Sequence, residues 1–142
     1  MMLLTDKEGD YPFLWHWLAQ RTGLPWCSDM RTIGLARDDG MLISVCAFNS
    51  FLHGKQCFIH FAADEPINRA YLRAIFRYLF VESQMKSVLG LFDANNTDIH
   101  TFVERVGFRF KVALEGGLLY EMTPDICKWI DHGKKERSAA AA

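Results

Sequence analysis

Residues that can take up a proton gather around one apolar stretch in the middle of the chain. His60 lies within 56–63, and Asp64 and Glu65 follow that stretch directly. An imidazole or a carboxylate in such a place can act as a general base. The apolar neighbours of His60 alternate with it, so if they face the core, His60 points to the other face of a strand. Structural roles are the alternatives. His60 could be a packed or hydrogen-bonded strand histidine, and Asp64 and Glu65 could be loop acids that interact favourably with the dipole of the following helix.

A basic row follows on the next segment. Apolar residues recur at helical spacing over 67–82, which predicts an amphipathic helix, and Arg69, Arg73 and Arg77 lie at i, i+4 and i+8 on another of its faces. The row could meet an anionic ligand or could be a solvated helix face. With 16 basic and 17 acidic residues, the net charge is −1. That balance argues against bulk attraction to nucleic acid or to an anionic membrane.

Metal-binding patterns are not apparent. The five histidines form no HxxxH or HExxH pattern, and the cysteine spacings fit no CxxC pair. Two of the cysteines sit in apolar, strand-like runs, where a free thiol behaves as a small hydrophobe. We therefore expect no metal and reduced, structural cysteines, which are Cys27, Cys46, Cys57 and Cys127.

Composition predicts one globular domain. The chain has 142 residues, of which 50% are hydrophobic and 23% charged. We expect the domain to span 1–133 and the remaining residues, 134–142, to form a flexible tail. No apolar run approaches the ~20 residues that span a bilayer. The first residues turn acidic too early for a secretory signal. These features favour a cytoplasmic protein.

The remaining elements follow from periodicity and turn residues. A helix is expected over 11–20, with Phe13, Trp17 and Leu14 or Leu18 facing inward. Another is expected to begin near Asn96 or Thr97 as its cap, and to stop at Gly107. Strands are expected at 32–37, 41–49, 56–63, 87–92, 109–114 and 118–122, and a last short helix at 124–131.

The order of elements from Cys57 to Met122 resembles the acetyl-CoA-binding half of the GNAT superfamily of N-acetyltransferases. That family ends a short helix with a pattern close to Asn-x-x-Ala-x-x-Leu-Tyr-x-x-x-Gly-Phe. Asn96, Phe102 and the pair Gly107-Phe108 match it. The resemblance implies an α/β fold with a mixed, mostly antiparallel sheet of about six or seven strands, flanked by about three or four helices.

Two positions depart from the family. Its phosphate loop reads Gln/Arg-x-x-Gly-x-Gly/Ala. Arg69 and Ala74 fit the ends of this pattern, and Leu72 replaces the middle glycine. Val103 stands where many members have a tyrosine that protonates the leaving thiolate, and valine cannot donate a proton. Leu72 could crowd the phosphates, and the acidic loop before the helix would repel them.

The resemblance also implies a ligand and its contacts. Acetyl-CoA would lie in the gap between 57–63 and 87–92, with its pyrophosphate at the start of the helix over 67–82. Asn96 would contact the cofactor, cap its helix, or do both. The implied cofactor-binding residues are Phe61, Ala62, Ala63, Arg69, Arg73, Ala74, Asn96 and Phe102.

The leading hypothesis is an acetyl-CoA-dependent N-acetyltransferase that acts on an unidentified amine. Asp64 or Glu65 would be the base, through water, with His60 as the further candidate. The alternative is a GNAT-fold binding or structural protein without catalysis. The chain also resembles the compact, divergent GNAT-like proteins that are common among bacteriophages. An enzyme predicts an open gap between the two strands, whereas a structural protein predicts a gap filled by side chains such as Leu72 or Phe92. Either protein could be a homodimer.

Overall fold

A computed structural model describes residues 1–6 and 12–132. Its centre is one seven-stranded sheet with the order β1-β2-β3-β4-β5-β7-β6. All neighbouring strands are antiparallel except β4 and β5, which are parallel. The expected α/β fold with a mostly antiparallel sheet is confirmed. The strands are β1 (Met2–Leu4), β2 (Arg31–Ala36), β3 (Leu42–Leu52), β4 (Gln56–Ala63), β5 (Ser87–Phe92), β6 (Arg109–Leu114) and β7 (Gly117–Met122).

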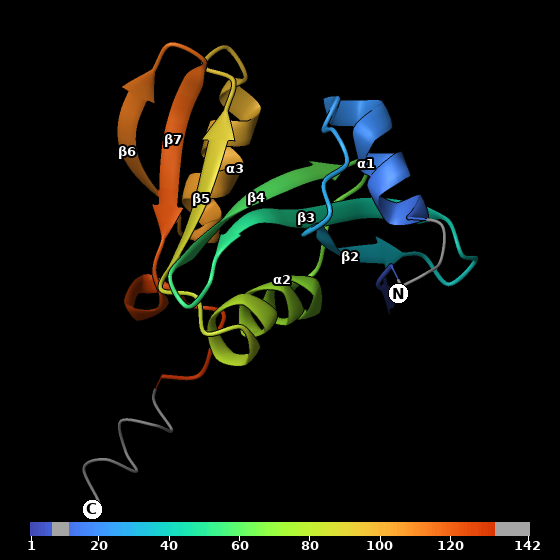
Figure 1. Cartoon of the computed structure of the whole chain (residues 1–142). Coiled ribbons are helices and arrows are strands. Elements are labelled where there is room, and N and C mark those ends of the chain that lie inside the picture. The colour runs from blue at the N-terminus through green and yellow to red at the C-terminus, as the bar shows by residue number, and fades with distance from the viewer. Residues whose placement is uncertain (7–11, 133–142) are drawn as a thin grey trace, which may run out of the picture.

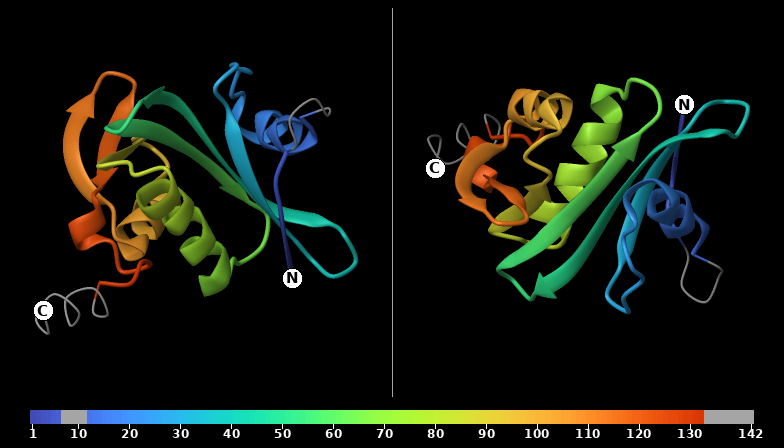
Figure 2. Two further views of the ribbon diagram at one scale, coloured as in Figure 1. Left: turned by 60° about the horizontal axis from the view of Figure 1, so that its bottom comes forward. Right: turned by 90° about the horizontal axis from the view of Figure 1, so that it is seen from above.

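Helices cover both faces of the sheet (Figures 1 and 2). α1 (Phe13–Thr22) packs on one face, where Val45 and Ala47 of β3 lie beneath it. α2 (Arg69–Phe76) and α3 (Thr97–Val106) pack on the other face. α2 continues without a break into the π-helical turns of η1 (Arg77–Glu82), and a single 3-10 turn, η2 (Pro124–Ile126), follows β7.

The main core lies between the sheet and the pair α2 and α3. Its largest fully buried side chain, Tyr71 of α2, keeps its hydroxyl satisfied there. That hydroxyl donates to the carbonyl of Ile33 at 2.9 Å and accepts from Ser44 Oγ at 3.2 Å. A buried polar group without such partners would cost stability. Tyr71 therefore fixes α2 against β2 and β3, beside the strand that carries the site.

α1 begins with help from a distant carboxylate. Pro12 offers the helix no side-chain cap, and Asp6 accepts the backbone N–H groups of Leu14 and Trp15 at 3.1 and 3.2 Å. Leu14 and Leu18 face the sheet as expected. The inward prediction for Phe13 was wrong, because the stripe that includes Leu14 leaves its side chain 47% exposed.

Other boundaries also differ from expectation, by one residue or more. The helix predicted over 67–82 begins two residues later, at Arg69, because Asn68 caps it by accepting from the N–H of Tyr71 at 2.8 Å. β3 extends to Leu52, beyond the predicted 41–49. The helix predicted over 124–131 is only the single turn of η2. α3 begins and ends as predicted, with Asn96 as cap and a left-handed Gly107 (φ 124°) at its end.

β4 and β5 pair over only a short stretch. Their register joins Gln56 to Ser87 and ends at the pair Phe58–Leu89. Beyond that pair β4 runs on to Ala63 and β5 to Phe92, and the two strands splay apart in Figure 1. We call the space between these diverging ends the β4–β5 gap.

Candidate active site

The β4 backbone presents unpaired groups to the β4–β5 gap. At one end of the strand, the N–H of Ser87 donates to the carbonyl of Lys55 at 3.0 Å, so Lys55 faces β5. At the other end, the N–H of Asp64 donates to the carbonyl of Ile43 at 2.7 Å, so Asp64 faces β3. Successive residues of a strand alternate between the two sides. The N–H and C=O groups of Phe61 and Ala63 therefore point into the gap, past the last β5 pair.

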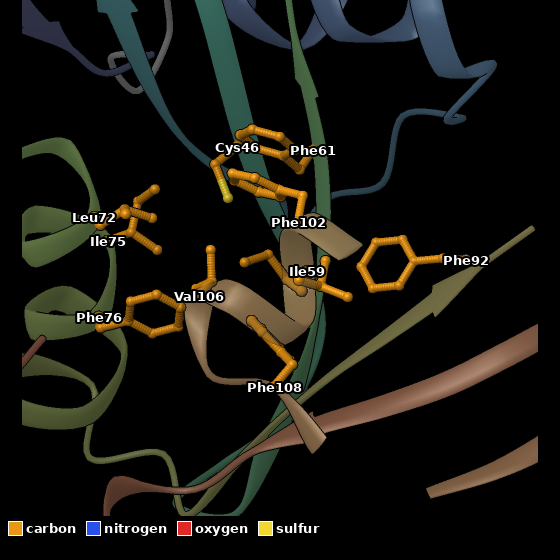
Figure 3. A pocket seen from close by; sticks show the side chains of 11 residues that line it. Cys46, Ile59, Phe61, Leu72, Ile75, Phe76, Phe92, Phe102, Val106 and Phe108 are labelled. Carbon is orange, nitrogen blue, oxygen red and sulfur yellow. The ribbon is translucent and has the colours of Figure 1, made fainter. Parts of the chain in front are cut away.

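The floor of the gap is packed with aromatic and aliphatic side chains. Phe61 of β4 stacks on Phe102 of α3, with ring centroids 5.1 Å apart and 8° between the planes. Gly90 leaves room for the ring of Phe92, which lies beside Ile59 (Figure 3). Only a cavity of about 30 Å³ remains, and it is lined by Cys46, Ile59, Phe61, Leu72, Ile75, Phe76, Phe92, Phe102, Val103, Val106 and Phe108.

Above this floor lies an open cleft of about 550 Å³, which we call the β4–α3 cleft. It is formed by the ends of β4 and α1, by the connection from β4 to α2, and by the first turn of α3. Its lining residues are Arg21, Thr22, Phe61, Ala62, Ala63, Glu65, Pro66, Ile67, Asn96, Asp98, Ile99 and Phe102. The gap is thus neither fully open nor fully filled: Leu72 and Phe92 close the floor, and the cleft remains above them.

Both carboxylates proposed as bases are engaged by arginines. Asp64 accepts from Nε and Nη2 of Arg21 at 3.0 and 2.8 Å. This hydrogen bonding holds the pKa of the Asp64 carboxyl below its ordinary value. Glu65 Oε2 lies 3.3 Å from Nη1 of Arg37. A lowered pKa makes Asp64 a poor proton acceptor, and the two arginines offset the negative charge of the loop before α2.

His60 lies on the α1 face of β4 and is held by a strand neighbour. Its Nε2 is 2.8 Å from Oδ1 of Asn49, and the amide nitrogen of Asn49 donates to the sulfur of Cys27 at 3.5 Å. An amide oxygen can only accept, so Nε2 carries the proton and Nδ1 keeps a free electron pair. Burial lowers the pKa of His60 below its ordinary value. The imidazole is therefore neutral at pH 7.

The predicted phosphate-binding residues divide into two groups. Arg69 and Arg73 are both exposed on α2, with Arg69 as its first residue and Arg73 in its last turn. Ala74 lies elsewhere, because it lines a separate cavity with Ile33 of β2. The stretch aligned with the family's phosphate loop is helix, and the connection before it supplies the turn at the start of α2.

The expected crowding by Leu72 is not seen. Its side chain turns toward the floor of the gap, away from the start of α2. Arg69 and Ala70, the first two residues of the helix, are exposed. Exposed N–H groups of a first helical turn suit an anion. The first turn of α2 is thus open to solvent at Arg69 and Ala70, whereas the N–H of Tyr71 is already bonded to the side chain of Asn68.

Several cleft residues were not singled out from the sequence. Arg21 and Thr22 come from the last turn of α1, and Asp98 and Ile99 from the first turn of α3. Neither pair is near β4 in sequence, so only the packing of α1 and α3 on opposite faces of the sheet brings them together. Asn96, which was predicted, lines the cleft while its side chain caps α3.

Within the described part of the chain, no helix is long and apolar enough to cross a membrane. The same residues contain no group of three or more histidine, cysteine or acidic side chains that could hold a metal ion.

No protein-family sequence model and no curated protein sequence matches this chain. Solved structures do match its fold. The N-acetyltransferase PseH from Campylobacter jejuni, in complex with acetyl coenzyme A, aligns with a TM-score of 0.61 at 11% identity, over 87% of this chain and 99% of that one. The chain has the GNAT acyltransferase fold.

Two further structures with this GNAT fold extend the comparison. A mutant form of spermidine/spermine N-acetyltransferase SpeG from Vibrio cholerae aligns with a TM-score of 0.67 at 10% identity, over 87% of this chain and 95% of that one. A GNAT-family acetyltransferase from Bacillus anthracis aligns with a TM-score of 0.52 at 14% identity, over 68% and 67% of the two chains.

Proposed function

We propose that this protein is an acetyl-CoA-dependent N-acetyltransferase acting on a primary amine. The observation that carries the proposal is the unpaired edge of β4 beside an open cleft. Phe61 and Ala63 offer backbone N–H and C=O groups that can pair with the amides of a pantetheine arm, as an added strand would. The structural similarity to PseH, which was solved with acetyl coenzyme A, supports the same ligand here.

The two ends of the ligand would meet different surroundings. The start of α2, with Arg69 and Arg73 on its exposed side, suits the pyrophosphate. The stacked rings of Phe61 and Phe102 form an apolar wall for the arm. Asn96 and Asp98 close the other side of the cleft. Acetyl-CoA supplies a thioester whose carbonyl carbon can accept a nucleophile.

Among the proposed bases, we favour His60. A primary amine has a pKa of about 10 and must lose a proton before it attacks. The neutral imidazole of His60 can accept that proton at Nδ1 through water, whereas the carboxylate of Asp64 is held by Arg21. His60 lies about 7 Å along β4 from Ala62, which lines the cleft on the same side of the strand. Asn49 acts as a positioning residue, because it fixes the tautomer.

The reaction would then proceed by direct transfer. The amine nitrogen bonds to the acetyl carbon, the carbon–sulfur bond breaks, and the amine proton passes through water to His60. CoA leaves as a thiolate and takes a proton from solvent, because Val103 is buried in the floor and carries no acidic group. A thiol pKa of about 8.5 makes the thiolate an adequate leaving group near neutral pH.

The test is release of free CoA with a panel of amines that includes polyamines and peptide amino termini. With an accepted amine, we expect H60Q to lower kcat by about 10²-fold or more. D64N should retain far more activity. H53Q, which changes an exposed histidine in the β3–β4 turn, is the matched control. Equal activity of H60Q and wild type would refute the role of His60, and no turnover with any amine would count against the enzyme itself.

A further inference from the structure

The hydrogen bond between His60 and Asn49 is one end of a longer row of polar side chains. Nε2 of His60 lies 2.8 Å from Oδ1 of Asn49, and Nδ2 of Asn49 lies 3.5 Å from Sγ of Cys27. The thiol of Cys27 in turn donates to the carboxylate of Asp29. Asn49 is buried, and the other three side chains are partly exposed. The row therefore begins at an imidazole and ends at a carboxylate.

Two irregular segments bring these side chains together. Cys27 and Asp29 lie in the connection from α1 to β2. A bulge in β3 directly follows Asn49, and Ser50 in this bulge adopts a left-handed conformation with a φ of 55°. In the same bulge, the N–H of Phe51 donates to Oδ2 of Asp29 at 3.0 Å. The carboxylate therefore fastens the connection to the strand that carries Asn49.

The proton of the Cys27 thiol has two possible acceptors. A side-chain amide has an acceptor oxygen and a donor nitrogen, and a thiol can both donate and accept weakly. If the thiol donates to Asp29, its sulfur can accept from the amide nitrogen of Asn49, and the amide oxygen faces His60. This is the arrangement in the structure. If the thiol donated to Asn49 instead, the amide would turn over, and its nitrogen would face His60.

The charge of Asp29 favours the first arrangement. Hydrogen bonding, chiefly from the N–H of Phe51, lowers the pKa of the Asp29 carboxyl below its ordinary value, so this group is an ionised acceptor at pH 7. Burial is the main cause that raises the pKa of the Cys27 thiol, which therefore keeps its proton. Hydrogen bonds to an ionised acceptor are roughly twice as strong as those between neutral groups. The thiol proton therefore goes to the carboxylate.

We infer that Asp29 and Cys27 are positioning residues, which set the tautomer of His60 through the amide of Asn49. With the thiol proton directed to the carboxylate, every donor of the row points the same way, toward Asp29. The proton of the imidazole is then held at Nε2, and Nδ1 keeps its electron pair. The inference rests on the proposed function only for its catalytic consequence, which is that this electron pair receives the proton of the amine.

D29N tests the inference with little change of shape. The new side-chain oxygen can still accept from the N–H of Phe51, while the new nitrogen donates to the sulfur of Cys27. The thiol proton must then go to Asn49, whose amide turns over, so the proton of His60 moves to Nδ1. Nitrogen-15 NMR of the full chain distinguishes a protonated ring nitrogen from a bare one, above the ordinary histidine pKa of about 6.5. We expect Nε2–H in wild type and Nδ1–H in D29N, with H60Q to assign the signals.

Variants of Cys27 separate the thiol proton from the shape of the side chain. C27S keeps a group that donates and accepts, so it should retain the wild-type tautomer of His60. C27A removes both functions and should leave the two tautomers mixed. D93N is the matched control, because Asp93 also accepts a backbone N–H, that of Asn95 at 2.9 Å, and lies outside the row. It should retain the wild-type tautomer, and circular dichroism confirms that each variant is folded.

The result that would overturn the inference is a His60 that keeps Nε2–H in D29N, or one that switches to Nδ1–H in C27S or in D93N. If D29N does not fold, C27A decides, and a single Nε2–H tautomer in that variant would overturn the inference. With an accepted amine, D29N should lower kcat by about tenfold or more, and C27S should stay near wild type. The NMR measurement needs neither acetyl-CoA nor an amine, so its outcome is separate from that of the proposed acetyl transfer.

Discussion

Phe61 of β4 and Phe102 of α3 stack nearly parallel across the β4–β5 gap, with their centroids 5.1 Å apart. The pair joins the strand that would carry acetyl-CoA to the helix on the other side of the gap. Below the rings only a small apolar cavity remains, and above them lies the β4–α3 cleft. The stacked pair therefore sets the depth to which a ligand can enter between the strands.

Removing one ring should cost both stability and affinity. For F102A we expect a loss of about 2–3 kcal/mol in the free energy of unfolding, less than the ~3–5 kcal/mol of a fully buried phenylalanine because Phe102 is only half-buried. Urea denaturation measures this loss. F110A, which truncates an exposed phenylalanine, is the control and should cost far less. If F102A unfolds at the same urea concentration as wild type, the ring does not support the floor of the gap.

The pair of Arg21 and Asp64 should control the charge at the rim of the cleft. In R21M the carboxyl of Asp64 loses its partner, so its pKa should rise toward the ordinary range of about 4. NMR titration of the carboxyl group measures that shift. Acetyl-CoA should then bind more weakly, because the loop before α2 regains its full negative charge. R21K keeps the positive charge, so its affinity for acetyl-CoA should lie between those of wild type and R21M. If R21M binds acetyl-CoA as tightly as wild type does, Arg21 does not control the charge at the rim of the cleft.

Burial of His60 should make stability depend on pH in one direction. Its pKa is lower in the folded chain than in the unfolded chain, so the unfolded state binds more protons as the pH falls through this range. Stability should be fully present above about pH 6.5 and should be lost as the pH falls toward the lowered pKa. H60Q should flatten this dependence in urea denaturation between about pH 5 and 8. A pH dependence equal to that of wild type would mean that other groups cause it.

The same lowered pKa should appear in catalysis. If His60 is the base, kcat/KM should fall only when the pH drops below the ordinary histidine range of about 6.5, where the imidazole becomes protonated. N49A should move this acid limb, because the hydrogen bond that fixes the tautomer is lost. Steady-state rates across the pH range give the profile. If kcat/KM of N49A falls at the same pH as that of wild type, a group other than His60 causes the fall.

Asp6 should stabilise α1 from outside the helix. Its carboxylate accepts two N–H groups of the first turn and the hydroxyl of Thr32 at 3.0 Å. D6A should therefore lower the free energy of unfolding by about 1 kcal/mol, as the loss of a helix cap does. Thermal denaturation followed by circular dichroism measures it. D38A, at an exposed carboxylate, should have a much smaller effect, and a D6A protein as stable as D38A would show that α1 needs no such cap.

Elements with strong local signals could be predicted from the sequence. The strands 56–63 and 87–92 and the helix after Asn96 were predicted at their true bounds, because turn and cap residues flank them. The prediction of a final helix after Pro124 was wrong, because one proline at a first turn does not sustain a helix without a continuing apolar stripe. Phe13 was misplaced because a run rich in large apolar residues on every face gives helical periodicity little contrast.

The candidate site was predictable only in part. Phe61, Ala62, Ala63, Asn96 and Phe102 were singled out by the resemblance, and they line the cleft. The ion pairs that engage Asp64 and Glu65 were not predictable, because Arg21 and Arg37 are distant in sequence and reach the loop only through the packing of α1 and β2. The partner of His60 is likewise a product of strand register, which sequence spacing alone does not give.

Isothermal titration calorimetry with acetyl-CoA tests the central claim most directly. We predict one site per chain with a dissociation constant of about 1–100 μM, or roughly −8 to −5 kcal/mol. A63W, which fills the cleft at the exposed end of β4, should weaken binding by tenfold or more while leaving the fold intact. Absence of heat and of thermal stabilisation at millimolar acetyl-CoA would contradict the account, and the chain would then be a binding or structural protein with this fold.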